Sequence, residues 1–300
     1  MRIGVVGAGL MGHGIAQVFA RAGHDVAIYD QSPDALATVH RRVRENLQAM
    51  GLPLDAAERI ALSPTLEGAI GDAEVVIEAA FEDLGVKRAV FREIEAAAPR
   101  DAIVATNTSV MTVGDVTAEA RTPGRMLGTH WWNPPHLIPL VEVVQGERTD
   151  PAAVQRMLAL LEGAGKSPVH VRRDVPGFVG NRLQHALWRE AFALVDEGVC
   201  DAETVDRVVK QSFGLRLAVL GPIENADLVG LDMTEAIHRY LLPHLSRETV
   251  PSKTLSQHLQ RGEMGMKSGQ GMRSWSQEQA DGVRTALAAH LLRLAAERRG

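Results

Sequence analysis

The chain has 300 residues, which is enough for two domains with separate hydrophobic cores. Its 32 basic and 37 acidic residues give a formal net charge of −5, which argues against nucleic-acid binding through phosphate contacts. The single cysteine, Cys200, excludes an intrachain disulfide and a multi-cysteine zinc site, and we expect no metal. The sequence shows no run of membrane-spanning length and no targeting signal, so we expect no membrane partner and a cytoplasmic location.

The first 30 residues predict a βαβ unit. An apolar run, residues 2–6, leads into the turn Gly7-Ala8-Gly9-Leu10-Met11-Gly12. Apolar positions at helical spacing follow over residues 15–20, and a second apolar run, residues 26–29, ends at Asp30. Strand, glycine turn, helix and strand in this order form the first unit of a dinucleotide-binding fold.

The rest of the chain changes character near residue 176. Before it, three more runs are apolar on both faces, as strands buried in a parallel sheet are: residues 75–77, 103–105 and 140–144. After it, helical patterns take over. The sequence therefore predicts an α/β, Rossmann-type, doubly wound and mostly parallel sheet in residues 1–175, followed by an all-helical C-terminal domain in residues 176–300. The charged segment 33–71 exceeds an ordinary crossover and predicts a helical hairpin inserted into the first domain.

The glycine turn predicts an NAD site. Gly7 permits a tight turn, Gly9 lets a pyrophosphate approach the backbone, and Gly12 lets helix and strand pack closely. The N-terminus of the helix offers free N–H groups and a positive dipole end to the phosphates. Asp30 would bind the ribose hydroxyls and repel a 2′-phosphate, which favours NAD over NADP. The alternative, a packing turn with an unrelated aspartate, fits this context poorly.

His130 and Glu142 are candidates for proton transfer. Oxidation of an alcohol needs a group that accepts the hydroxyl proton, and imidazole suits this role near neutral pH. Glu142 interrupts an apolar run, where an unpaired charge is costly, so it needs a partner, and His130 is the nearest upstream candidate. The residues alone leave an alternative open: a structural histidine and a glutamate that ends a strand in solvent.

Several spaced motifs resemble the 3-hydroxyacyl-CoA dehydrogenase family over nearly the whole chain. They occur in the family's order: Gly7–Gly12, Asn107–Ser109, His130–Pro134, Leu140–Val143, Pro176–Phe178 with Asn181 and Arg182, Gly221–Pro222, Gly230–Asp232 and Gly265–Gly271. The resemblance implies an NAD-dependent dehydrogenase acting on a CH–OH group of a small-molecule substrate, with NAD as cofactor. It also implies a homodimer formed through the helical domain.

The resemblance also implies roles for single residues. His130 is the base and Glu142 its partner, while Ser109 and Asn181 position the substrate oxygens. A loop-capping hydroxyl is the alternative for Ser109, and a helix cap is the alternative for Asn181. Four further polar residues match positions near the cofactor or active site, with solvated surface side chains as the alternative: Glu82, Lys87, Asn133 and Lys267. The expected cofactor contacts include four more residues: Leu10, Met11, Gln31 and Asn107.

Two departures concern the substrate. Trp131 and Trp132 stand where the family commonly has two phenylalanines, and the following loop, residues 134–139, resembles relatives that act on free hydroxy acids or small cyclic alcohols. Examples are gulonate dehydrogenases and a pyridine-carboxylate dehydrogenase of vitamin B6 breakdown. His136 in this loop either contacts a substrate carboxylate or lies at the surface.

The predicted hairpin, which grips CoA in the family, carries Arg41, Arg42 and Arg44 but is interrupted by Gly51-Leu52-Pro53. These arginines fit either CoA phosphates or a solvated face. The family favours oxidation of a 3-hydroxyacyl-CoA in fatty-acid-type metabolism. The loop favours a free hydroxy acid or a small cyclic hydroxy or aldehyde acid. A non-catalytic NAD-binding structural protein is the third alternative, and retention of the four catalytic candidates argues against it.

Overall fold

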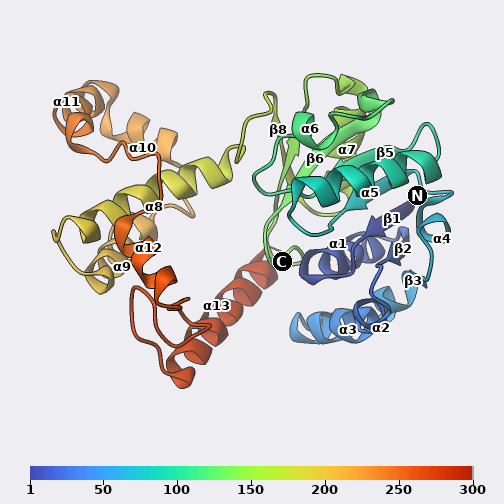
Figure 1. Cartoon of the computed structure of the whole chain (residues 1–300), viewed down its shortest axis with the longest axis horizontal. Helices are drawn as coiled ribbons and strands as arrows, with labels where there is room; N and C mark the ends of the chain where they lie inside the picture. Colours follow the sequence, from blue (N-terminus) through green and yellow to red (C-terminus); the bar gives the residue numbers. More distant parts are fainter. Residues whose placement is uncertain (299–300) are drawn as a thin grey trace. The chain divides into compact units, whose positions relative to one another are not determined.

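The computed structural model describes residues 1–298, which form two compact units (Figure 1). The first unit comprises Met1–Arg182 together with residues 287–298 at the end of the C-terminal helix. The second unit comprises Leu183–Ala286. No helix within residues 1–298 is both long enough and apolar enough to cross a membrane.

The first unit is built on one sheet, which among the described residues has eight strands in the order β3-β2-β1-β4-β5-β6-β7-β8. Neighbouring strands are parallel except β6 and β7, which are antiparallel. The order places β1 between β2 and β4, as in a doubly wound fold. The predicted fold class is thereby confirmed. The strands are β1 (Arg2–Val6), β2 (Asp25–Tyr29), β3 (Ile60–Ser63), β4 (Val75–Glu78), β5 (Ile103–Thr106), β6 (Met126–Trp131), β7 (Leu140–Val144) and β8 (Ser167–Val171).

Helices cover both faces of the sheet. Residues of α1, α3 and α7 share a buried apolar cluster with one face, and residues of α4, α5 and α6 share a second cluster with the other. The helices of this unit are α1 (Leu10–Arg21), α2 (Pro33–Ala37), α3 (Val39–Ala49), α4 (Leu66–Ile70), α5 (Leu84–Ala97), α6 (Val113–Val116) and α7 (Pro151–Gly163), with 3₁₀ turns at Asp55–Arg59 and Pro123–Arg125.

The segment predicted to be a helical hairpin is folded onto the sheet instead. Val39, Val43 and Leu47 on α3 are fully buried in the cluster that contains Ile15 of α1. The 3₁₀ turn after α3 leads directly into the edge strand β3, which pairs with β2. The hairpin prediction is therefore wrong, because the apolar stripe of α3 packs against α1 and the expected second arm is an edge strand.

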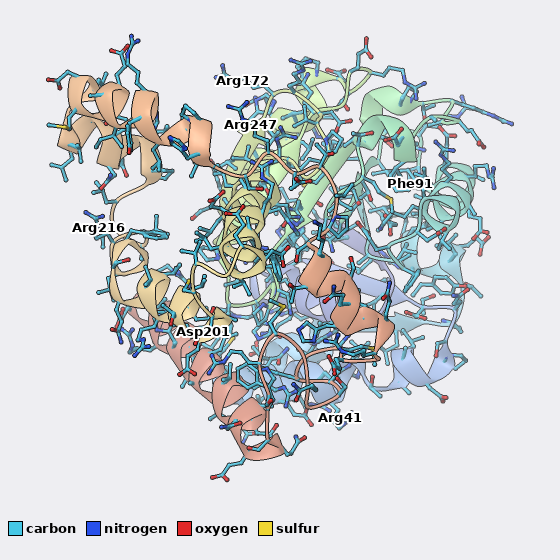
Figure 2. All side chains as sticks on the ribbon, turned by 60° about the vertical axis from the view of Figure 1, so that its left-hand side comes forward. Arg41, Phe91, Arg172, Asp201, Arg216 and Arg247 are labelled. Carbon is cyan, nitrogen blue, oxygen red and sulfur yellow. The ribbon has the colours of Figure 1, made fainter. Side chains whose placement is uncertain are left out.

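The second unit is helical, as predicted. Asp201 caps α9 by accepting a hydrogen bond from Thr204 N at 2.7 Å, and the aspartate is labelled in Figure 2. Near Gly265–Gly271 the described chain makes two isolated β-bridges rather than a strand. The remaining helices are α8 (Gly180–Asp196), α9 (Ala202–Gln211), α10 (Pro222–Val229), α11 (Leu231–Leu241), α12 (Lys253–Gln260) and α13 (Gln277–Glu297), with 3₁₀ turns at Phe213–Leu215 and Leu242–His244.

The division between the units differs from the predicted boundary at residue 176. The first unit extends to Arg182, and the chain returns to it from Leu287 onward. The physical reason for the return is apolar contact, since Ala295 of α13 is buried in a cluster with Met50 and Leu137.

Candidate active site

The glycine turn joins β1 to α1 at the carboxyl edge of the sheet. Gly7 has a φ of +106°, which favours glycine, and a Cβ there would lie 2.5 Å from Ala79 O. A Cβ on Gly12 would lie 1.7 Å from Gly7 O, so glycine is needed for the helix to start this close to the strand. The Cβ position of Gly9 is open, with no atom of a described residue beyond its chain neighbours within 4 Å. The turn thus has the accessible backbone that a pyrophosphate requires.

Asp30 and Arg42 hold the glycine turn from two sides. Ala8 N donates to Asp30 Oδ2 at 2.6 Å, which places the half-buried carboxylate beside the turn. The Arg42 guanidinium donates to Ala8 O, and to Gly9 O at 3.3 Å. Arg42 therefore contacts the glycine turn, and neither role considered for it from the sequence, a CoA contact or a solvated charge, fits this position.

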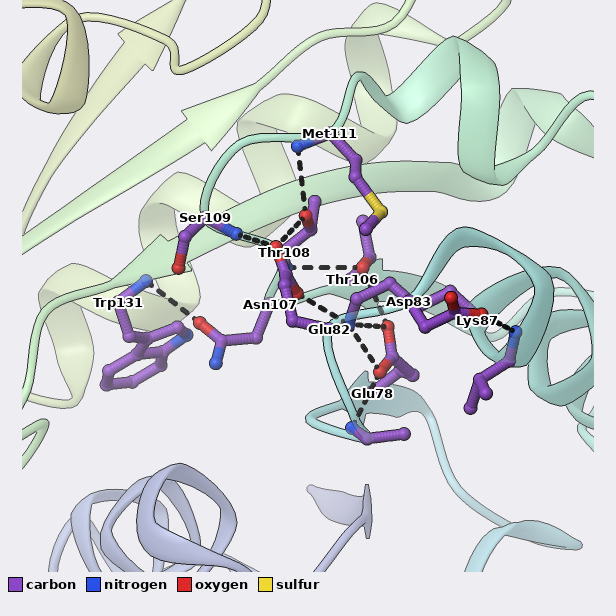
Figure 3. A network of polar contacts seen from close by, with 12 residues as sticks. Glu78, Glu82, Asp83, Lys87, Thr106, Asn107, Thr108, Ser109, Met111 and Trp131 are labelled. Atoms are coloured by element: carbon purple, nitrogen blue, oxygen red, sulfur yellow. Dashed lines mark hydrogen bonds and ion pairs between the residues drawn. The ribbon is translucent and has the colours of Figure 1, made fainter. Parts of the chain in front are cut away.

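Lys87 lies inside the protein. Its side chain is 0% exposed, and its Nζ is 2.9 Å from Glu78 Oε1 and 3.3 Å from Glu82 Oε2 (Figure 3). This corrects the prediction for Lys87: its ammonium group faces two carboxylates, so it is neither a direct cofactor contact nor a solvated surface charge. Its place suits a residue that holds Glu82 in position.

Glu82 connects Lys87 to the loop after β5 (Figure 3). Its Oε1 accepts hydrogen bonds from Thr108 Oγ1 at 2.6 Å and from Ser109 N at 2.8 Å. Burial by itself raises the pKa of Glu82, but these hydrogen bonds and Lys87 outweigh it and lower the pKa. Asn181 Nδ2 donates to Ser109 O at 2.7 Å. The structure therefore brings Asn181 to the backbone of Ser109, and the role of both residues in positioning substrate oxygens stays a prediction.

Glu78 was not identified from the sequence. It ends β4, is 0% exposed, and accepts hydrogen bonds from Thr106 Oγ1 at 2.7 Å and Ala80 N at 2.6 Å in addition to Lys87. The available signal was a carboxylate at the end of a fully apolar run, the same signal that identified Glu142. A buried glutamate that accepts four hydrogen bonds from three donors is fully satisfied and rigidly held.

The ladder between β6 and β7 places His130 directly opposite Glu142. His130 Nδ1 is 2.7 Å from Glu142 Oε2, and the side chains are 4% and 1% exposed. Glu142 Oε1 accepts from Val179 N at 2.9 Å and Gly180 N at 3.0 Å, at the start of α8. Burial by itself raises the pKa of Glu142, but the hydrogen bonds from His130, Gly180 and Val179 outweigh it and lower the pKa. An ionised Glu142 can only accept a hydrogen bond, so the proton of a neutral His130 lies on Nδ1. Nε2 is then the unprotonated nitrogen that can act as a base.

Two aromatic rings enclose the imidazole. The ring centroids of Trp132 and Phe178 lie 5.0 Å and 5.6 Å from that of His130. A Cβ on Gly180 would lie 2.4 Å from Trp132 Cζ2, so α8 begins against the indole. Trp131 points to the other face of β6 and is 2% exposed in the core. The two tryptophans that distinguish the sequence therefore have different roles, one at the site and one in the core.

His136 packs against α1. A Cβ on Gly14 would lie 2.6 Å from Pro135 Cγ and 3.4 Å from His136 Nδ1. Burial, reinforced by nearby cations, lowers the pKa of His136 to about 4. The half-buried ring does not fit the surface alternative considered from the sequence. A contact between His136 and a substrate carboxylate stays a prediction.

Of the remaining predicted cofactor contacts, two are held by the interior of the first unit and four are exposed. Asn107 Oδ1 accepts from Trp131 N at 3.0 Å, and Met11 packs against the core beneath the glycine turn. Lys267 belongs to the second unit, where its side chain is exposed. Three residues of the first unit expose their side chains: Leu10, Gln31 and Asn133.

Fold and site together define a class of protein. An open glycine turn, an acid at the end of β2 and an enclosed histidine–glutamate pair at the carboxyl edge are the parts of a dinucleotide-dependent dehydrogenase. Within residues 1–298, no group of three or more His, Cys, Asp or Glu side chains is arranged to hold a metal ion.

Family models place the chain within this class. Residues 2–175 match the model described as 3-hydroxyacyl-CoA dehydrogenase, NAD binding domain, and residues 177–275 match its C-terminal domain. The chain belongs to the 3-hydroxyacyl-CoA dehydrogenase family and is an NAD-dependent dehydrogenase. The predicted family and cofactor are confirmed.

Curated relatives differ in substrate. The chain is 36% identical over 295 residues to a 5-formyl-3-hydroxy-2-methylpyridine 4-carboxylate 5-dehydrogenase of Mesorhizobium japonicum, covering 97% of this chain and 96% of the relative. It is 41% identical over 233 residues to an L-carnitine dehydrogenase of Streptomyces griseus, covering 76% and 70%. It is 33% identical over 285 residues to a 3-hydroxyadipyl-CoA dehydrogenase of Escherichia coli, covering 92% and 59%.

A solved structure agrees closely in fold. The crystal structure of a 5-formyl-3-hydroxy-2-methylpyridine 4-carboxylic acid 5-dehydrogenase, described as an NAD⁺-dependent dismutase, superposes with a TM-score of 0.92 at 34% identity. The superposition covers 100% of this chain and 98% of that chain.

Proposed function

We propose that this enzyme oxidises a free hydroxy acid, or a small cyclic acid that carries a hydroxymethyl or aldehyde group, and that its substrate carries no CoA. The observation that carries the proposal is the structure of α3 and of the chain after it. In the family the hairpin at this place grips CoA, and here the chain returns to the sheet as β3.

The arginines of α3 support the same conclusion. Arg42 is directed to the glycine turn. Arg41 pairs with Glu45 at 2.9 Å, and Arg44 pairs with Glu58. A phosphate of CoA would have to displace a glutamate from Arg41 or Arg44. This competition lowers the affinity expected of these two arginines for a phosphate. We therefore propose a free acid ahead of the thioester that the family resemblance favoured.

The relatives add independent support. The pyridine-carboxylate dehydrogenase matches 97% of this chain, and the L-carnitine dehydrogenase has the higher identity over a shorter region. Both names describe substrates without CoA. The loop of residues 134–139, interpreted from the sequence as similar to such relatives, points the same way.

In the proposed reaction His130 Nε2 accepts the hydroxyl proton of the substrate, whose oxygens Ser109 and Asn181 orient. Glu142 stabilises the imidazolium that forms, in an enclosed site where the attraction is stronger than in water. When bound, NAD supplies the hydride acceptor. An aldehyde can present the same CH–OH group as its hydrate, so His130 can serve both substrate types.

Oxidation of a 3-hydroxyacyl-CoA is the second candidate. It is favoured by the match over 285 residues to a 3-hydroxyadipyl-CoA dehydrogenase. In this case Arg41 and Arg44 would exchange their carboxylate partners for CoA phosphates.

A paired assay of NADH fluorescence separates the two candidates. Enzyme with NADH receives acetoacetyl-CoA or acetoacetate, and enzyme with NAD receives L-carnitine or 5-formyl-3-hydroxy-2-methylpyridine 4-carboxylate. We expect kcat/KM for at least one free acid to exceed that for acetoacetyl-CoA by about tenfold or more. The opposite ranking would refute the proposal, and an Arg41→Ala/Arg44→Ala variant should then raise KM for the thioester.

We further propose a homodimer formed through the second unit. Several large apolar side chains are exposed on its helices, including Leu183 and Trp188 on α8 and Ile223 and Leu228 on α10. Exposure on this scale favours a protein interface. Sedimentation equilibrium tests it, and a monomer at micromolar concentration would contradict it.

A further inference from the structure

The loop that joins β6 to β7, residues 134–139, is held by a half-buried lysine. Lys166 precedes β8, and its Nζ donates to Pro135 O and to Ile138 O, each at 2.6 Å. The same ammonium lies 5.2 Å from the ring centroid of Trp131, which neighbours the proposed base. Both hydrogen bonds come from one amino group, so Lys166 ties two carbonyls of the loop together.

The end of α13 holds the same loop from another side. Leu137, in the middle of the loop, is 7% exposed and packs in a cluster with Met50 and Ala295, each also 7% exposed. Arg298 Nη2 donates to Leu137 O at 2.8 Å. A third carbonyl of the loop is therefore held by the C-terminal helix.

This helix lies outside the part of the chain that the family models match. The C-terminal model ends at residue 275, and α13 spans Gln277–Glu297. Its last turns contact Met50 at the end of α3 and the partly buried Leu52 that follows. The end of the C-terminal helix thus packs where Gly51-Leu52-Pro53 interrupts the predicted hairpin.

We propose that the end of α13, residues 287–298, is a positioning element of the active site that acts together with Lys166. Both hold loop 134–139, which connects the strand of His130 to the strand of Glu142. A shift of this connection moves the ends of the two strands relative to each other and is expected to lengthen the 2.7 Å hydrogen bond between Nδ1 and Oε2. The inference rests on the proposed roles of His130 and Glu142.

Two adjacent alanines provide a matched test. Ala295 is 7% exposed in the cluster, whereas Ala296 is exposed. Ala295→Glu puts a charge into apolar surroundings and should displace the end of the helix, while Ala296→Glu keeps the same helix propensity at the surface. Hydrogen exchange is measured at the amides of His136, Leu137 and Ile138, because the other three residues of the loop are prolines without an N–H. The values of kcat and KM are measured with whichever of the four probe substrates turns over fastest.

In Ala295→Glu we expect faster exchange of the loop and a fall in kcat of about tenfold to a hundredfold. The Kd of NADH should stay within about twofold, because the glycine turn is untouched. Ala296→Glu should match the wild type in all three measurements. Arg298→Ala should lower kcat less, and Arg298→Lys should restore part of it.

Two results would overturn the inference. One is faster exchange at residues 134–139 with kcat unchanged, which would separate the loop from catalysis. Leu292 of α13 packs against the same cluster as Ala295. The other result is unchanged exchange in the Leu292→Glu/Ala295→Glu double variant, which would show that the helix does not hold the loop. A His130→Gln variant measured in parallel distinguishes the two proposals, because its full activity would refute the role of His130 itself.

Discussion

His130 and Glu142 stand directly opposite each other across β6 and β7, and their side chains meet at 2.7 Å although 12 residues separate them in the chain. Directly opposed residues of an antiparallel ladder project to the same face of the sheet. Glu142 also accepts two N–H groups from the start of α8. One carboxylate therefore joins the base, the sheet and the first turn of the long helix.

Removal of the base should stop the reaction without affecting the cofactor. We expect His130→Ala to lower kcat by about 10²–10⁴-fold, the usual contribution of a general base, and to leave the Kd of NADH nearly unchanged. Glu142→Gln should also lower kcat strongly, because an amide cannot stabilise the imidazolium by charge. Stopped-flow turnover and NADH fluorescence titration measure the two effects, and near-original turnover in either variant would contradict the proposed roles.

Asp30 should control the choice between NAD and NADP through Arg42. Asp30→Asn removes the charge that repels a 2′-phosphate and leaves the Arg42 guanidinium beside the turn. We expect the ratio of kcat/KM for NAD over NADP to fall by about tenfold or more, equivalent to at least about 1.4 kcal/mol. Asp30→Asn/Arg42→Ala should bind NADP less well than the single variant. An unchanged ratio in Asp30→Asn would count against both residues.

The buried pair of Glu78 and Lys87 should matter for stability far more than a surface pair. Lys87→Met leaves Glu78 buried without its cation and should lower the free energy of unfolding by about 3–5 kcal/mol. The Glu78→Gln/Lys87→Met double variant should recover part of the loss. Arg92→Ala breaks the exposed pair with Glu119, of similar length, and should cost about 0–1 kcal/mol. Equal losses in urea unfolding would refute the distinction.

Lys166 should make stability depend on pH. Burial, with the charges of Arg298 and Arg21, lowers its pKa to about 7, and His136 also lies near it. Between about pH 7 and 10 the unfolded chain holds a proton that the folded chain has lost, so this group makes stability rise with pH. Lys166→Met should remove this slope, which is at most about 1.4 kcal/mol per pH unit for one proton. Urea unfolding at several pH values checks it, and identical slopes in both proteins would contradict the assignment.

The sequence by itself determined the local parts of the fold and predicted the pairing of His130 with Glu142. The glycine turn, the strand that ends at Asp30 and the apolar runs of β4, β5 and β7 are set by short-range sterics and by burial on both faces, which a one-dimensional pattern records. Glu142 was detectable because a carboxylate in an apolar strand requires a partner.

Only the tertiary structure decided where the polar residues of the site are directed. Lys87 is enclosed by Glu78 and Glu82, Arg42 contacts the glycine turn, and His136 packs against α1. The hairpin prediction failed for the same reason, since charged helices with an apolar stripe look alike in sequence whether they project or pack. These outcomes depend on contacts between segments far apart in the chain, including α13 on loop 134–139. Such contacts leave no periodic signal, because burial and charge pairing are properties of the assembled fold.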